Sequence, residues 1–107
     1  MSKTRSAVVL GAALAVASVA TMQSVAADEA LATKNNCMAC HKVDVKVVGP
    51  AYKEIAAKYK GDAAARDLLI EKVKKGGSGT WGPIPMPPNV AASDEDIATL
   101  VDWVLSM

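Results

Sequence analysis

The clearest amphipathic pattern in the chain is its last stretch, SDEDIATLVDWVLSM, residues 93–107. Apolar side chains recur there at Ile97, Leu100, Val101 and Val104, which is the spacing of one face of a helix. Ser93 is a favoured N-cap residue, and the three acidic residues after it suit the positive end of a helix. The pattern therefore predicts a helix that follows Ser93 and buries one face.

Three weaker helical patterns precede this one. DEALATKNN, residues 28–36, begins with acidic residues and predicts a short helix. AYKEIAAKYK, residues 51–60, follows a proline and should end at Gly61. DAAARDLLIEKVKK, residues 62–75, should stop at the glycine pair that begins with Gly76. Since no stretch alternates with the period of a strand, we expect an all-α domain of about four helices.

A long segment without helical character separates the last two predicted helices. GGSGTWGPIPMPPNVAA, residues 76–92, contains four of the five prolines, and proline removes a backbone donor and fixes φ. The segment has no charged residue and includes Trp81, Ile84 and Met86, which a disordered linker would not be expected to carry. We therefore expect a stiff, extended loop.

The first residues differ from the rest of the chain. Lys3 and Arg5 precede an uncharged run rich in Ala and Val, residues 7–20, and small residues then lead to Asp28. This order is typical of a secretory signal peptide, here 1–27, with cleavage after Ala26 or Ala27. The alternative is an uncleaved membrane anchor, but the run is shorter than the roughly 20 apolar residues of a spanning helix. The sequence thus predicts one exported domain, residues 28–107, that does not insert into a membrane.

Charge and composition narrow the class of protein. The formal charge of the whole chain is +1, and loss of the two basic residues of the signal peptide makes it −1. A nucleic-acid-binding protein would normally be strongly basic, so we expect no nucleic-acid partner. Phe is absent and only four residues are Tyr or Trp. A domain this small and this poor in aromatic residues usually needs a covalent or cofactor staple.

The stretch NNCMACHKV, residues 35–43, holds both cysteines and the only histidine. Two thiols three residues apart can each add to a vinyl group of a haem, and the imidazole of His41 can then bind the iron; Cys-x-x-Cys-His is the attachment motif of c-type haem. A thioredoxin-like redox pair would require a βαβ setting, and a zinc site would require further Cys or His ligands. The motif therefore favours one covalent haem, attached through Cys37 and Cys40.

The sixth ligand of the iron must come from elsewhere, since no second histidine exists. Met, Lys, the N-terminus or no ligand at all are possible. Met38 lies between the two cysteines and Met107 is the last residue, whereas Met86 is flanked by prolines in the stiff loop. A preorganised loop is well suited to present a weak thioether ligand, so we expect Met86 to bind iron.

His/Met ligation fills both axial positions and raises the reduction potential, which favours a one-electron carrier rather than an enzyme. Two alternatives stay open: a haem enzyme, which would need an open iron or a second haem, and a gas-binding haem sensor, which would need Met86 to leave the iron readily.

Four stretches together carry a family resemblance: CMACH, VGPAYKEIAAKY, KKGGSGTWGPIPMPPN and LVDWVLSM. With them, essentially all of 28–107 resembles the small bacterial class I cytochromes c of the c-551/c-552 type. The resemblance implies a compact monohaem fold, a periplasmic location and electron delivery to partners such as nitrite reductase or a terminal oxidase. The sequence is silent on dimerisation, and we expect a monomer.

The resemblance also implies roles for residues around the haem. Pro50 would offer its carbonyl to the far ring nitrogen of His41, and Asn89 would donate toward the sulfur of Met86. Trp81 would donate its indole N–H to a haem propionate, although plain core packing is the alternative. Lys72 occupies a position at which the family often has a basic residue near a propionate.

Overall fold

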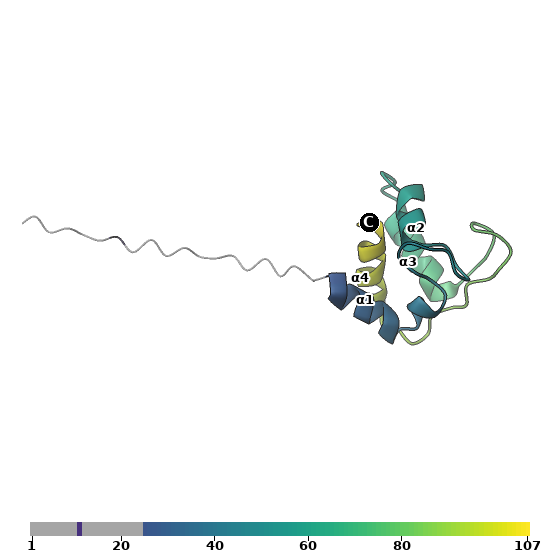
Figure 1. The fold of residues 1–107 in the computed structure, drawn as a ribbon, viewed down its shortest axis with the longest axis horizontal. Coiled ribbons are helices and arrows are strands. Elements are labelled where there is room, and N and C mark those ends of the chain that lie inside the picture. Colours follow the sequence, from purple (N-terminus) through teal and green to yellow (C-terminus); the bar gives the residue numbers. More distant parts are fainter. Residues whose placement is uncertain (1–10, 12–24) are drawn as a thin grey trace, which may run out of the picture.

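The structure is a computed structural model that describes residue 11 and residues 25–107 (Figure 1). Its elements are α1 (Val25–Lys34), the 3₁₀ turn η1 (Cys37–Ala39), α2 (Tyr52–Lys58), α3 (Ala65–Lys75) and α4 (Asp94–Leu105). The described residues form no strand, only one isolated antiparallel bridge. The predicted all-α fold of about four helices is confirmed.

The last helix, α4, organises the others. It packs against α1, α2 and α3, and its predicted apolar face is buried. The predicted cap is also present, because the Ser93 side-chain oxygen accepts a hydrogen bond from the Asp96 amide at 3.1 Å. Arg66 of α3 donates two hydrogen bonds, of 2.7 and 3.3 Å, to the Asp102 carboxylate of α4. The C-terminal helix is therefore the shared packing partner of the domain.

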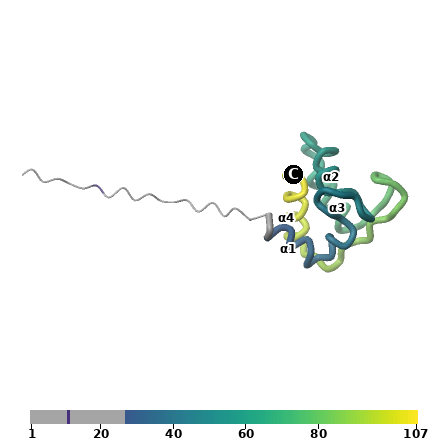
Figure 2. The backbone as a smooth tube through the Cα atoms, viewed as in Figure 1, coloured from purple at the N-terminus to yellow at the C-terminus, as the bar shows by residue number. Residues whose placement is uncertain are grey.

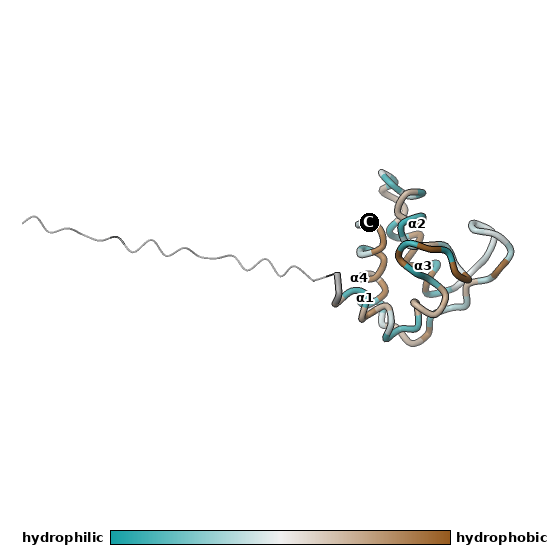
Figure 3. Tube along the Cα trace, viewed as in Figure 1, coloured by the Kyte–Doolittle hydropathy of each residue, from teal (hydrophilic) through white to brown (hydrophobic). Residues whose placement is uncertain are grey.

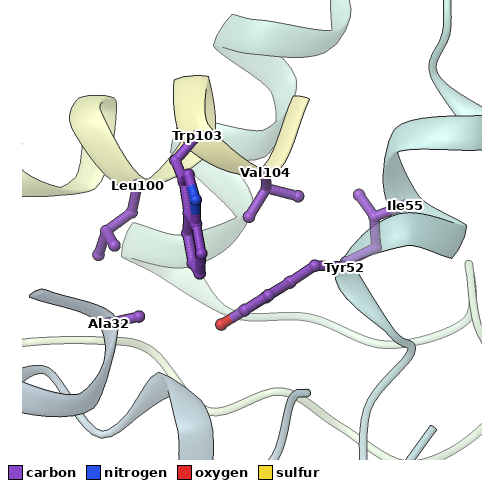
Figure 4. Close-up of a cluster of buried hydrophobic side chains, with 6 residues drawn as sticks. All are labelled: Ala32, Tyr52, Ile55, Leu100, Trp103 and Val104. Carbon is purple, nitrogen blue, oxygen red and sulfur yellow. The ribbon is translucent and has the colours of Figure 1, made fainter. Parts of the chain in front are cut away.

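A small apolar cluster lies where α1, α2 and α4 meet (Figure 4). The ring of Tyr52 meets the edge of the Trp103 indole with their centroids 5.4 Å apart, a favourable aromatic geometry. Ala32 faces the pair from α1, and Leu100 and Val104 complete the cluster from α4. Burial and the neighbouring Cys37 thiol raise the pKa of Tyr52, so its hydroxyl stays neutral.

Two helix starts differ from the sequence-based expectation. α1 begins at Val25 rather than Asp28, because the small apolar residues before Asp28 continue the helix easily. α3 begins at Ala65 rather than near Asp62, because the Asp62 carboxylate accepts a hydrogen bond from the Ala64 amide and closes a turn before the helix. Apart from residue 11 and residues 25–27, the predicted signal peptide lies outside the described residues, and its cleavage stays a prediction.

The proline-rich segment 76–92 leaves α3 as a long loop whose tip lies on the side away from α1 and α4 and whose last part returns to the start of α4 (Figure 2). α3 ends at Lys75 and is capped by Gly76, whose positive φ of 71° suits glycine at a helix C-terminus. A second irregular segment, 43–48, lies before α2, and the hydropathy colouring shows apolar stretches there as well as on α4 (Figure 3). These two irregular segments leave a space against the inner faces of the helices.

Candidate functional site

A cavity of about 320 Å³ lies between the two irregular segments and helices α2, α3 and α4. Its volume is within the range of roughly 300 to 1,000 Å³ that is usual for small-molecule sites. Ile55, Leu69 and Leu100 give it apolar walls from the three helices. All the residues predicted to attach the haem or bind its iron line this one cavity, namely Cys37, Cys40, His41 and Met86.

The Cys-x-x-Cys-His stretch forms a tight turn at one side of the cavity. Asn36 directly precedes the turn and has a positive φ of 63°, a conformation that Asn tolerates better than most residues. The amides of Cys40 and His41 both donate to the carbonyl of Cys37, at 3.2 and 3.0 Å. The two thiols are half-buried and are not joined in a disulfide, and burial raises the pKa of the Cys37 thiol. The turn thus presents both sulfurs and the imidazole to the same cavity.

His41 is held at one of its two ring nitrogens. Nδ1 lies 2.8 Å from the carbonyl oxygen of Pro50, where the predicted hydrogen bond requires it. When Nδ1 donates its proton to that carbonyl, Nε2 carries a free lone pair and can bind a metal. The ring of Tyr52 stacks on the imidazole with centroids 5.2 Å apart and planes inclined by 20°. The imidazole is therefore fixed both in tautomer and in position.

Met86 belongs to the proline-rich segment 76–92, and hydrogen bonds to its backbone hold it in place. Its amide donates to the carbonyl of Gly77 at 2.8 Å, and the Gly77 amide donates back to the Met86 carbonyl at 3.0 Å. Gly76 allows the two sides of the loop to approach this closely, since a Cβ there would collide with the Met86 carbonyl oxygen and would lie 2.9 Å from the Pro88 nitrogen. The loop therefore presents Met86 from a closed, hydrogen-bonded base rather than from a free end.

Two further predicted residues, Asn89 and Trp81, make other contacts than expected, and a third, Lys72, lies where it was predicted. Asn89 donates through Nδ2 to the carbonyl of Asn35 at 3.1 Å, and its side-chain oxygen accepts two backbone amides. Since Nδ2 carries two protons, one is still free for the sulfur of Met86.

Trp81 is 40% exposed, and the Lys58 ammonium lies 5.8 Å from its ring centroid. Lys72 lines the cavity, as a propionate partner would.

Two residues of the site are not indicated by the sequence patterns. Tyr52 lies within the predicted helix 51–60, and nothing in that pattern indicates that its ring contacts His41. Gly77 was assigned only to the end of α3, although it pairs with Met86. The doubled glycine was an available signal, because one glycine is sufficient to end a helix and the second allows a close approach.

The donor set fits a haem rather than a bare metal ion. Two thiols in a Cys-x-x-Cys-His turn, an imidazole with a free nitrogen and a thioether surround a mainly apolar cavity. Within the described residues, no group of three or more His, Cys, Asp or Glu side chains could hold a metal ion. The residues present are those that bind a macrocycle covalently and ligate its iron.

Comparison with known protein families gives one match, to the model described as Cytochrome c, over residues 25–107. The cytochrome c-551 of Allochromatium vinosum is 49% identical over 94 residues, which are 88% of this chain and all of that protein. The cytochrome c-552 of Nitrosomonas europaea is 58% identical over 81 residues, 76% of this chain and 79% of that protein.

Solved structures agree with the sequence relatives. The crystal structure of Nitrosomonas europaea cytochrome c552 matches with a TM-score of 0.71 and 58% identity, and covers 73% of this chain and 96% of that one. The class 1 cytochrome MtoD of Sideroxydans lithotrophicus matches with a TM-score of 0.64 and 40% identity, and covers 78% and 95% of the two chains. The fold, and not only the motif, is shared with these proteins.

Proposed function

Since the chain belongs to the cytochrome c family, whose members carry one covalent c-type haem and transfer electrons, we propose that it is a periplasmic one-electron carrier with His41 and Met86 as axial ligands. The observation that carries this proposal is the meeting of Cys37, Cys40, His41 and Met86 at one apolar cavity. Electrons would pass from a respiratory donor to a terminal reductase or oxidase, such as nitrite reductase or cytochrome oxidase.

The chain's own residues would hold the haem iron in a fixed coordination. A bound haem supplies an iron that alternates between the ferrous and ferric states. Pro50 keeps the proton of His41 on Nδ1, which leaves Nε2 for the iron. Gly77 holds the backbone of Met86, so that its thioether is offered from the other segment. With His41 and Met86 both bound to the iron, small substrates would be excluded and only electrons would be exchanged.

The surface around the cavity suits brief encounters with redox partners. Val48 and Ile84 line the cavity and are 46% and 61% exposed, and Lys46, two residues before Val48, also lines it. An exposed apolar rim with nearby charges favours fast, weak association, in which the charges set mainly the association rate. We propose that the protein acts as a monomer and docks through this rim.

The two alternative functions require an accessible iron. A haem enzyme or a gas-binding sensor would need the Met86 thioether to leave the iron. The hydrogen bonds to Gly77 keep the Met86 backbone beside the cavity, so a thioether that dissociated would rebind readily. The reduced holoprotein should therefore keep its absorption spectrum under carbon monoxide. Rapid conversion to a carbon monoxide complex would contradict the carrier and favour the sensor or the enzyme.

Export can be tested on the same preparation. We expect the protein in the periplasmic fraction, with an intact mass equal to residues 27–107 or 28–107 plus one haem. The small residues before Asp28 and the single Cys-x-x-Cys-His motif are the reasons. A mass that retains residues 1–20 would indicate an uncleaved anchor. The described residues contain no helix that is long and apolar enough to cross a membrane.

A further inference from the structure

Gly49 lies directly against the imidazole of His41. A Cβ atom built on Gly49 would be 2.5 Å from Cε1, 2.9 Å from Nδ1 and 3.1 Å from Nε2 of that ring. Real Cβ atoms essentially never approach other heavy atoms below 3.0 Å. The imidazole therefore occupies the space in which any other residue at position 49 would place its side chain.

The requirement for glycine comes from this contact and not from the backbone. Within residues 25–107, the other five glycines all have positive φ, whereas Gly49 does not. An alanine at position 49 would meet no backbone strain of the left-handed kind. The ring of His41 alone excludes a side chain there.

The surroundings confine the ring on the other sides. The Gly49 amide donates to the carbonyl of Cys40 at 2.8 Å, which anchors this segment to the Cys-x-x-Cys-His turn. Pro50 holds Nδ1, and Tyr52 stacks on the ring. Three residues within one short segment thus restrain the imidazole by a steric contact, a hydrogen bond and a stacked ring.

We infer that Gly49 is a positioning residue that sets the plane of the axial imidazole. The inference rests on the proposed role of His41 as an iron ligand. An added methyl group would turn the ring about its bond to the chain, because the backbone of position 49 is tied to Cys40. The orientation of an axial imidazole alters the electronic structure of a ferric haem, and outer contacts of a ligand tune the metal it binds.

The test compares two alanine variants of the holoprotein. Gly49→Ala places a methyl group on the ring, whereas Gly61→Ala strains a backbone of φ +77° with no heavy atom within 4 Å of the new group. We expect Gly49→Ala to shift the haem-methyl proton resonances and the ferric electron paramagnetic resonance signals, together with the reduction potential. Gly61→Ala should lower the melting temperature and leave those three readouts at their wild-type values.

The outcomes separate this inference from the proposed function. A wild-type ferric spectrum without the signature of His/Met ligation would refute the ligand assignment itself. With that signature present, wild-type resonances and potential in Gly49→Ala would refute the positioning role alone. If Gly49→Ala gives little holoprotein, Gly49→Ala with Tyr52→Leu should give more, because the imidazole then has room to turn. No gain in the double variant would also refute the inference.

Discussion

Met86→His is expected to lower the reduction potential markedly and to give a haem with two imidazole ligands. Imidazole donates more strongly than a thioether and stabilises ferric iron, and axial-ligand choice moves haem potentials over about 0.8 V in all. The loop can present the new side chain because Gly77 holds the backbone of position 86, not its side chain. Voltammetry of the purified variant measures the fall.

Met86→Ala should open the iron to water, carbon monoxide or a lysine. Lys72 lines the same cavity and is one possible source of that lysine. The control is Met38→Leu, since Met38 packs against the apolar cluster and does not line the cavity. That control should keep the wild-type potential and still exclude carbon monoxide. If Met86→Ala behaves in the same way, another group is the sixth ligand.

Cys37→Ala or Cys40→Ala is expected to yield little folded protein. Without the covalent haem, half-buried apolar side chains of the cavity wall such as Leu69 and Val73 would face water. Burial of one such side chain is worth roughly 1.5 to 3 kcal/mol. The burial of a few such side chains contributes as much as the whole free energy of unfolding of a domain this size, which is roughly 0.05 to 0.15 kcal/mol per residue. Circular dichroism and thermal melting should therefore show weak helicity and no cooperative transition.

The matched control for the cysteine variants is Ala39→Ser. Ala39 lies in the same turn and is exposed, so the substitution leaves both thiols in place. It should yield holoprotein with normal melting. Native-like helix content and cooperative melting in Cys37→Ala/Cys40→Ala without haem would show that the polypeptide has a sufficient core of its own.

Local chemistry predicted much of the architecture. Ser93 and the apolar spacing after it located α4 correctly, because a cap and a helical face are both properties of adjacent residues. The glycines after α3 ended that helix as expected. The prolines around Met86 likewise ruled out a helix there. In each case the interactions that determine the local structure join residues only a few positions apart in the chain.

The contacts that complete the site could not be predicted in this way. The pairing of Gly77 with Met86 and the donation from Asn89 to Asn35 join residues that are distant in sequence. Gly49 is close to His41 in the chain, yet their contact depends on how the segment between them turns back. A hydrophobic pattern states which face is buried, but it does not specify the atoms that meet there.

The central position of α4 in the packing also affects when the domain can fold. The helices α1, α2 and α3 pack on α4, so on the proposed export route the globule would not close before this late segment emerged from the membrane. Until then the turn at Cys37–Ala39 lies in an open chain. Closure depends on contacts between the two ends of the domain, which form slowly compared with local turns. The order of emergence therefore leaves an interval in which both thiols can be reached and modified before the fold encloses them.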